Sequence, residues 1–384
     1  MITRRLLLIV GLSPSLAFAQ APRQIRLRPA TAELKEEFTV IGSVRELPDG
    51  RVLINDPREG RVVLADLKTG IVEQVGRKGQ GPNEYSMAGP IFPISADSSL
   101  LADGLSRRWL LFSGPTIVAT LPPLTPIVTA TKGFIRGTDQ RGSVWLTVSA
   151  KPFDQEKAKP GSIDFGPADS DFVVRGNRTT GKLDTIAKVR VAISRQTVRS
   201  NEQGKFSGVS FARAPLAVGE EAALFPDGWL AVARLDPYRV DWISPDGRVN
   251  KGAPIPVVPI KVTSAEKEAY RARLAAARAG SRVTLPPAMQ ADVNALGDQF
   301  PEEFPPFTAL GALAGGDGNL WLRHPVSMNY PDARYDVVDR SGRLVGVVSL
   351  GKDERIVAVS KTAVYVAWKD ADDIERLRRH PPVP

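Results

Sequence analysis

The sequence predicts an all-β fold, a six-bladed β-propeller built from four-stranded sheets. Three observations lead to this prediction: short β-type runs fill most of the 384 residues, glycine-containing turns separate these runs, and the strand–turn units recur along the chain. Each unit is a small sheet that cannot bury both of its faces alone. Packing the units side by side around one axis supplies that burial and leaves only short edges.

Four strands of five or six residues each begin directly after a glycine turn. The glycines are Gly50, Gly142, Gly228 and Gly318. Turns of this kind favour glycine, and to a lesser degree asparagine or aspartate, because these residues readily adopt positive φ. A second turn follows three of these strands at a similar distance. The recurring unit is therefore strand, turn, strand, turn, strand.

Six such units can be delimited along the chain. They span residues 40–85, 86–122, 125–190, 215–262, 305–350 and 352–378. The second unit is degenerate, because it lacks the turn glycine of the others. The segment 24–39 precedes the first unit, and we expect it to add a strand that helps to close the ring. A seven-bladed ring and a pair of β-sandwiches are the alternative architectures.

A helix interrupts the strand pattern between the fourth and the fifth unit. The residues from Thr263 to Glu266 form a capping box, and the following stretch is rich in Ala, Arg, Glu and Lys until Gly280 stops it. We therefore predict a helical insertion at about 263–297, with a second short helix at 289–296. The segment 151–170 has few apolar residues and is expected to be a mobile loop.

The composition excludes several kinds of site. The chain has no cysteine, so it has no disulfides, zinc–thiolate centres or cysteine nucleophile. Its two histidines, His324 and His380, are too few for a three-histidine metal site. The net charge of +9 comes without any run of five basic residues, which favours a mildly basic surface over nucleic-acid binding. We predict no cofactor and no nucleic-acid partner.

The first nineteen residues have the layout of a secretory signal peptide. Arg4 and Arg5 precede the apolar run 6–12, and alanines flank Phe18 at the expected cleavage positions. The apolar run is too short to span a bilayer, and no later segment reaches 18 apolar residues. We predict cleavage after residue 19, one propeller domain over residues 20–384, and a periplasmic or secreted location. A twin-arginine export route is the alternative to general secretion.

The end of the first unit carries a more specific signal. Residues 76–85 read Gly-Arg-Lys-Gly-Gln-Gly-Pro-Asn-Glu-Tyr, and Pro90 follows. This stretch resembles the inter-blade signature of NHL-type propellers, and it is still more similar to the first-blade ending of the exported bacterial six-bladed β-propeller family. Asn83 and Tyr85 stand where that family has glycine and phenylalanine. Both departures are mild, because asparagine tolerates positive φ and tyrosine keeps the aromatic ring.

Two later stretches are similar to the same family. Residues 304–322 resemble its late-blade entry, and residues 363–377 resemble its closing blade. The resemblance implies a propeller fold and an exported location. It implies no catalytic signature that can be carried over to this chain.

Matching positions in different blades of a propeller converge on one face. Counting six residues past the turn glycine gives Asp56, Arg234 and His324, and Asp103 has a similar place in the second unit. Arginine contacts carboxylates and phosphates in a bidentate manner, so we expect an anionic or sugar-like ligand at this face. Local turn capping by the two aspartates is the alternative. The predicted ligand-binding residues are Asp56, Arg58, Asp103, Arg107, Arg234, Tyr238, Arg323 and His324.

These features predict an exported, non-catalytic propeller that binds a small molecule or a protein at one face, without catalytic or metal-binding residues. The alternative function is that of a metal-assisted hydrolase acting on a lactone or ester. Propeller lactonases hold calcium or a similar ion through carboxylate and amide oxygens on that face. Asn55, Asp56, Asp103 and Asp236 could supply such oxygens here if they converge, whereas Arg234 and Arg323 would oppose a cation.

Overall fold

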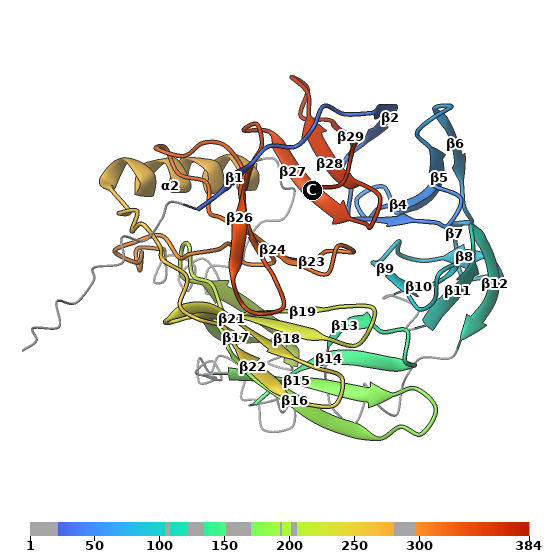
Figure 1. The fold of residues 1–384 in the computed structure, drawn as a ribbon, viewed down its shortest axis with the longest axis horizontal. Helices are drawn as coiled ribbons and strands as arrows, with labels where there is room; N and C mark the ends of the chain where they lie inside the picture. Colours follow the sequence, from blue (N-terminus) through green and yellow to red (C-terminus); the bar gives the residue numbers. More distant parts are fainter. Residues whose placement is uncertain are drawn as a thin grey trace, which may run out of the picture.

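The computed structural model describes residues 22–103, 108–121, 134–150, 170–192, 194–200, 206–279 and 297–383. Its strands form six larger sheets arranged around a central axis, along which the molecule is viewed in Figure 1. The signal peptide predicted for residues 1–19, the short helix predicted at 289–296 and nearly all of the loop predicted at 151–170 lie outside the described residues.

The first three blades are antiparallel sheets in which the first strand lies innermost. Blade 1 consists of β3 (Ser43–Glu46), β4 (Val52–Asp56), β5 (Arg61–Asp66) and β6 (Ile71–Gln74). Blade 2 consists of β9 (Ile91–Pro93), β10 (Ser98–Asp103), β11 (Arg108–Ser113) and β12 (Thr116–Leu121). Blade 3 consists of β13 (Phe134–Thr138), β14 (Ser143–Ser149), β15 (Ser170–Asn177) and β16 (Leu183–Arg190).

The other three blades complete the ring, and two of them use N-terminal strands. Blade 4 consists of β19 (Glu221–Leu224), β20 (Leu230–Leu235), β21 (Tyr238–Ile243) and β22 (Val249–Lys251). Blade 5 consists of β23 (Ala312–Ala314), β24 (Leu320–Arg323), β25 (Arg334–Val338), β26 (Leu344–Ser349) and the parallel strand β1 (Gln24–Ile25). Blade 6 consists of β27 (Glu354–Val359), β28 (Val364–Lys369), β29 (Glu375–His380) and β2 (Ala32–Phe38).

The ring is closed by contacts between innermost strands. Each of β3, β9, β13, β19, β23 and β27 contacts the next, and β27 contacts β3. The N-terminal strand β2 pairs with the C-terminal strand β29, with Leu34 opposite Leu377. The predicted six-bladed propeller is therefore confirmed, and so is the closing strand expected from residues 24–39. That segment supplies β1 as well, which widens blade 5 to five strands.

The core lies between neighbouring blades, and this explains why strands such as β4 are apolar without alternation. Leu53 packs with residues of blade 2, among them Leu101. Its neighbour Ile54 points to the other face of the sheet and packs with residues of blade 6, among them Tyr365. Side chains alternate between the two faces of a strand, so a sheet buried on both faces needs apolar residues at successive positions.

The segment with the family resemblance is a compact connection between blades 1 and 2. Gly76 and Asn83 both adopt positive φ, of 66° and 59°. The buried Tyr85 hydroxyl accepts a hydrogen bond from the Val62 amide at 2.9 Å and donates one to the Val75 carbonyl at 3.0 Å. The motif therefore anchors the connection to blade 1. Two short parallel strands, β7 (Arg77–Lys78) and β8 (Glu84–Tyr85), lie within it.

The two ends of the ring differ in the length of their connections. At one end, here called the turn face, the connections between consecutive strands of the same blade have at most five residues; examples are 47–51, 225–229 and 315–319. At the other end, the loop face, lie the connections 75–90, 191–220 and 252–311. Loops of this length on a rigid scaffold are where binding residues usually lie.

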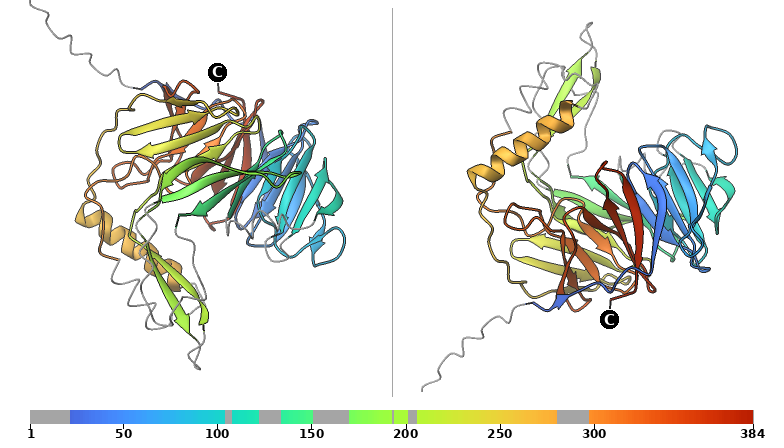
Figure 2. Two further views of the ribbon diagram at one scale, coloured as in Figure 1. Left: turned by 90° about the horizontal axis from the view of Figure 1, so that it is seen from below. Right: turned by 90° about the horizontal axis from the view of Figure 1, so that it is seen from above.

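Two elements stand out from the ring on the loop face. They are the hairpin of β17 (Ser194–Ser200) with β18 (Phe206–Arg213), and helix α2 (Ser264–Ala279). Figure 2 shows both projecting from the same side of the ring. The predicted helical insertion is thus confirmed. The Glu266 amide donates to the Thr263 hydroxyl at 3.3 Å, as in a capping box, but the Glu266 carboxylate accepts from the Met328 amide at 2.6 Å instead.

Helix α2 is amphipathic only weakly, and most of its described residues are exposed. Within the part of the chain that the structure describes, no helix is long and apolar enough to cross a membrane.

Candidate functional site

The sequence-predicted residues Asp56 and Asp103 both lie at the loop face, each at the end of the second strand of its blade. Asp56 is fully buried, and its carboxylate accepts hydrogen bonds from the amides of Thr39 at 2.8 Å and Arg58 at 2.9 Å. Asp103 accepts from the Ser86 amide and from the Arg108 guanidinium, both at 3.1 Å. Each carboxylate therefore fastens the loop that enters its blade, which is the local capping role.

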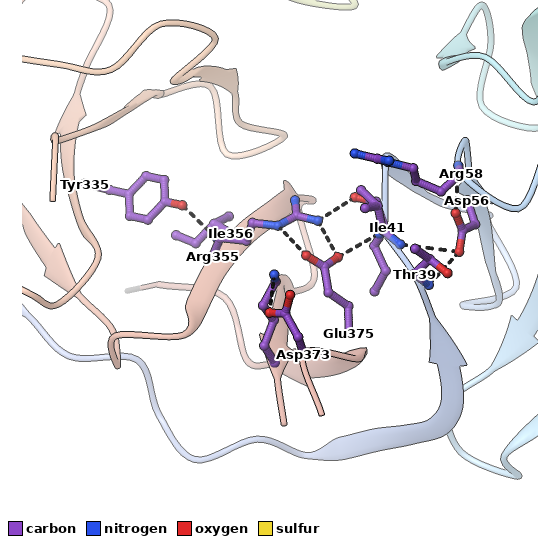
Figure 3. A network of polar contacts seen from close by, with 11 residues as sticks. Thr39, Ile41, Asp56, Arg58, Tyr335, Arg355, Ile356, Asp373 and Glu375 are labelled. Carbon is purple, nitrogen blue, oxygen red and sulfur yellow. Dashed lines mark hydrogen bonds and ion pairs between the residues drawn. The ribbon is translucent and has the colours of Figure 1, made fainter. Parts of the chain in front are cut away.

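Blade 6 has an equivalent carboxylate that sequence inspection missed. Glu375 accepts a hydrogen bond from the Ile41 amide at 2.7 Å and pairs with Arg355 at 2.6 Å (Figure 3). Arg355 also donates to the Ile41 carbonyl at 2.7 Å. Glu375 begins its strand instead of following a glycine turn by six residues, so the counting rule could not find it.

Arg58, unlike Arg355, has no carboxylate partner among the described residues. Its side chain is exposed and leads away from Asp56 in Figure 3. Its guanidinium makes no hydrogen bond or ion pair with the residues described by the structure; only its backbone amide is engaged, by Asp56.

Arg234 is held inside the ring. Its guanidinium pairs with Asp241 at 2.8 Å and with Glu220 at 2.7 Å. It also donates to the Lys188 carbonyl at 2.8 Å, which joins blade 4 to blade 3. The Nε and Nη1 groups of this guanidinium are therefore engaged by the protein itself.

Tyr238 and His324 are brought together across the boundary between blades 4 and 5. The Tyr238 hydroxyl donates to one oxygen of Asp336 at 2.6 Å, and His324 Nε2 lies 2.7 Å from the other. Burial, and then the Asp336 charge, raise the pKa of Tyr238 well above 10, so its hydroxyl is a proton donor at neutral pH. Asp336 is the central residue of this group and was not among the predicted site residues.

Arg323 lies at the end of β24, next to this group. Its Nε is buried without a hydrogen-bond partner, and the guanidinium makes no ion pair with any described residue. Burial raises the pKa of the Tyr335 hydroxyl, and the nearby charges of Arg323 and Arg355 partly oppose this shift. Arg323 and Arg355 therefore lie near the same tyrosine. The remaining predicted residue, Arg107, is outside the described residues.

A second polar group on the loop face has no counterpart among the predicted residues. Arg136 is the extra residue of a β-bulge in the innermost strand β13, and its Nε donates to the Thr147 hydroxyl at 2.9 Å. Bulges re-aim side chains and are frequent beside functional sites. Burial raises the pKa of both Asp171 and Glu221, and the nearby Arg136 charge opposes the shift at each. Raised carboxylate pKa values of this kind often mark functional sites.

The loop face therefore has two chemically different halves. Blades 5, 6 and 1, which are consecutive in the ring, carry Arg323, Arg355 and Arg58. Blades 3 and 4 carry Arg136 with Asp171 and Glu221. Among the residues that the structure describes, no group of three or more histidines or carboxylates could hold a metal ion.

The fold and this face define the chain as a six-bladed β-propeller with a loop-rich face. It matches no protein-family model, and no curated protein matches its sequence. Among solved structures it is similar to a member of the DUF4221 family from Bacteroides vulgatus, with 9% identity, a TM-score of 0.48, and 92% of this chain and 97% of that chain covered.

Two further solved structures are similar over most of their length. An exported protein from Bacteroides fragilis shares 8% identity with a TM-score of 0.45, covering 94% of this chain and 99% of that chain. The calcium-binding protein regucalcin from Agrobacterium tumefaciens shares 11% identity with a TM-score of 0.41, covering 94% and 96%. At these identities the likeness concerns the fold alone.

Proposed function

We propose that this protein is an exported, non-catalytic binding module that holds a carboxylate-bearing sugar at its loop face. The observation that carries the proposal is the contrast between paired and unpaired arginines there. Arg234 and Arg355 are consumed by carboxylates of the protein itself. Arg58 and Arg323 have no such partner among the described residues, so they are cations available to a ligand.

The chemistry of a guanidinium favours this class of ligand. Two parallel N–H donors match the two oxygens of a carboxylate, and such charge-assisted pairs are stronger than neutral hydrogen bonds. Sugar hydroxyls add donors and acceptors that the other half of the loop face can meet, because Asp171, Glu221 and Thr147 lie there. A ligand with both groups uses the whole polar surface.

The proposed location outside the cytoplasm rests on the signal-peptide layout of residues 1–19. Expressing the full chain in a Gram-negative host, followed by fractionation and N-terminal sequencing, tests it. We expect mature protein in the periplasm that begins at Gln20. Retention of the uncleaved chain in the cytoplasm would contradict export without affecting the proposed ligand site.

The ligand site is tested with the mature chain and uronic acid oligosaccharides as probes. Isothermal titration should show saturable binding, and the double variant R58A/R323A should weaken it at least about tenfold, the scale expected for lost charge-assisted hydrogen bonds. The control is Arg51→Ala on the turn face, where Arg51 pairs with Asp49 at 2.7 Å. Unchanged binding by the double variant would overturn the assignment.

The alternative function, a metal-assisted hydrolase, can be tested by the melting temperature of the same mature chain. A ligand that binds only the folded state raises the melting temperature. We expect calcium and EDTA to leave the melting temperature unchanged. A rise in calcium that EDTA reverses would contradict the proposal and favour the hydrolase.

A further inference from the structure

A polar hollow lies on the turn face, between blades 3 and 4. Its volume is about 290 Å³, and its lining includes Arg141, Arg175 and Lys182 together with a single carboxylate, Asp184. The hollow is formed by short turns, at the opposite end of the strands from the loop face. It therefore belongs to neither the predicted site residues nor the proposed sugar site.

The positive charges of this hollow are only partly neutralised by the protein. Arg175 Nη2 lies 3.6 Å and Lys182 Nζ lies 3.7 Å from the two oxygens of Asp184. Both distances exceed the 2.7–3.2 Å range of N–H···O hydrogen bonds. The Arg141 guanidinium makes no hydrogen bond or ion pair with any described residue. Three cations thus face one carboxylate that satisfies none of them by direct contact.

The wall that carries Arg141 is fixed from inside the fold. The buried Asp139 carboxylate accepts hydrogen bonds from the amides of Arg141 at 2.9 Å and Ser143 at 2.8 Å. The Gln140 amide donates to the Pro226 carbonyl of blade 4 at 2.8 Å, which joins this turn to the neighbouring blade. The turn therefore holds Arg141 at the boundary between the blades.

On the other side of the hollow, Asn177 and Arg175 are held in place. Asn177 Oδ1 accepts hydrogen bonds from the amides of Thr179 at 2.9 Å and Thr180 at 2.8 Å, so its amide NH₂ is the group left for a ligand. Arg175 donates to the Pro245 carbonyl at 2.9 Å and lies over the Trp145 ring, 5.8 Å from its centre. Groups held in place before binding lose little conformational freedom when a ligand arrives.

We propose that the turn-face hollow binds a doubly charged tetrahedral oxyanion, a phosphate or a sulfate, through Arg141, Arg175 and Lys182. Two guanidinium groups and one ammonium group supply charge-assisted donors to such an ion, and Asn177 adds a neutral donor. The ligand's two negative charges balance the surplus that Asp184 leaves.

The test uses the mature chain with inorganic phosphate and inorganic sulfate as probes, at constant ionic strength set with chloride. Isothermal titration and thermal melting should both show saturable binding to the unmodified protein. Lys182→Gln and Arg141→Gln should each weaken the affinity about tenfold, as expected for one lost charge-assisted contact. Whichever of phosphate and sulfate binds more tightly identifies the source of the oxyanion.

The carboxylate provides a variant with the opposite sign. Asp184→Asn removes the one negative charge, so it should tighten binding, a result that a folding defect cannot produce. Arg248→Gln is the matched control, because Arg248 pairs with Asp246 at 2.7 Å on the neighbouring turn. Equal effects of phosphate, sulfate and chloride, or unchanged affinity in R141Q and K182Q, would overturn the proposal. Neither outcome bears on the sugar site of the other face.

Discussion

The side chains of Tyr238 and His324 are joined through a single carboxylate, although they belong to different blades. Tyr238 donates to one oxygen of Asp336 at 2.6 Å, and His324 Nε2 lies 2.7 Å from the other oxygen. The contact crosses the boundary between blades 4 and 5, so it links the packing of the ring to the chemistry of the loop face. Each member of the group is buried or half-buried.

We predict that replacing Tyr238 destabilises the protein, and that this destabilisation becomes smaller at alkaline pH. Tyr238→Phe leaves an Asp336 oxygen without its donor and should lower the free energy of unfolding by about 1–3 kcal/mol at pH 8. The folded-state pKa of Tyr238 is raised above its ordinary value of 10. Its contribution is therefore complete below pH 10 and is lost as the pH rises from 10 toward the folded-state pKa. Denaturant unfolding at pH 8 and 11 measures the difference.

The control for this experiment is Tyr330→Phe, in which the exposed ring over Arg334 is kept. Its cost at pH 8 should be small. If the cost of Tyr238→Phe were the same at pH 8 and pH 11, the tyrosine–carboxylate contact would not be what stabilises this boundary.

For Asp103 we predict a contribution to the free energy of unfolding that is lost at acid pH instead of alkaline pH. Burial alone would raise its pKa, but hydrogen bonds from Ser86 and Arg108 outweigh burial and lower it. Stability from this carboxylate is therefore present above pH 4 and is lost as the pH falls through the folded-state pKa. Asp103→Asn should lower the free energy of unfolding by about 2 kcal/mol at pH 7, and by less at pH 3.

Urea unfolding curves for the unmodified chain and the Asp103→Asn variant at several pH values test this prediction. Asp372→Asn serves as a control at an exposed position. A gap between the two proteins that stays constant from pH 7 to pH 3 would show that the charge of Asp103 does not contribute.

Arg340 is predicted to hold blades 4 and 5 together at the turn face. Its guanidinium lies 5.4 Å from the Phe225 ring centre, 5.1 Å from that of Trp229 and 5.9 Å from that of Trp242, and pairs with Asp227 at 2.7 Å. Cation–π contacts strengthen when the cation is shielded from water. Arg340→Ala should lower the free energy of unfolding by about 1–3 kcal/mol.

The matched control is Arg343→Ala in the same turn, where the side chain is 78% exposed and pairs with Asp339. Its effect should stay within about 0.5 kcal/mol. Equal melting temperatures for the two variants would show that the aromatic contacts do not stabilise the blade boundary.

The N-terminal strand β2 is predicted to be essential for ring closure. Phe38 is 1% exposed and packs between the first and last blades. Phe38→Ala should lower the free energy of unfolding by about 3–5 kcal/mol, as for other large core residues. Lys35→Ala, at an exposed position of the same strand, should have little effect. A small loss in Phe38→Ala would mean that blade 6 is stable without its N-terminal strand.

Much of the fold could be predicted because its determinants are local. Glycines with positive φ at Gly50, Gly228 and Gly318 mark turns of the same kind in three blades. Strands such as β4, apolar at successive positions, follow from burial of both sheet faces. The capping residue Thr263 marks the start of the insertion helix.

The candidate site was predicted only in part, because a side chain's partners are not local. Spacing from the turn glycines placed Asp56, Arg234 and His324 at the loop face, but it could not show that the first two are occupied by the protein's own backbone amides and carboxylates. Arg136, Asp171 and Glu221 left no signal, because a bulge and burial between neighbouring blades create their environment.

The sequence by itself determined the turns, the recurring strand units and the segment that helps to close the ring, since each depends on backbone preferences and on the pattern of apolar residues along a few consecutive positions. It left a seven-bladed ring as an alternative, and the packing of one blade on the next decided for six. Only the tertiary structure decided which charges are free. Whether an arginine meets a carboxylate can depend on residues from another blade, as Arg61 with Glu36 and Arg340 with Asp227 show. In the sites proposed on both faces, the charges offered to a ligand are those that this packing does not fully neutralise.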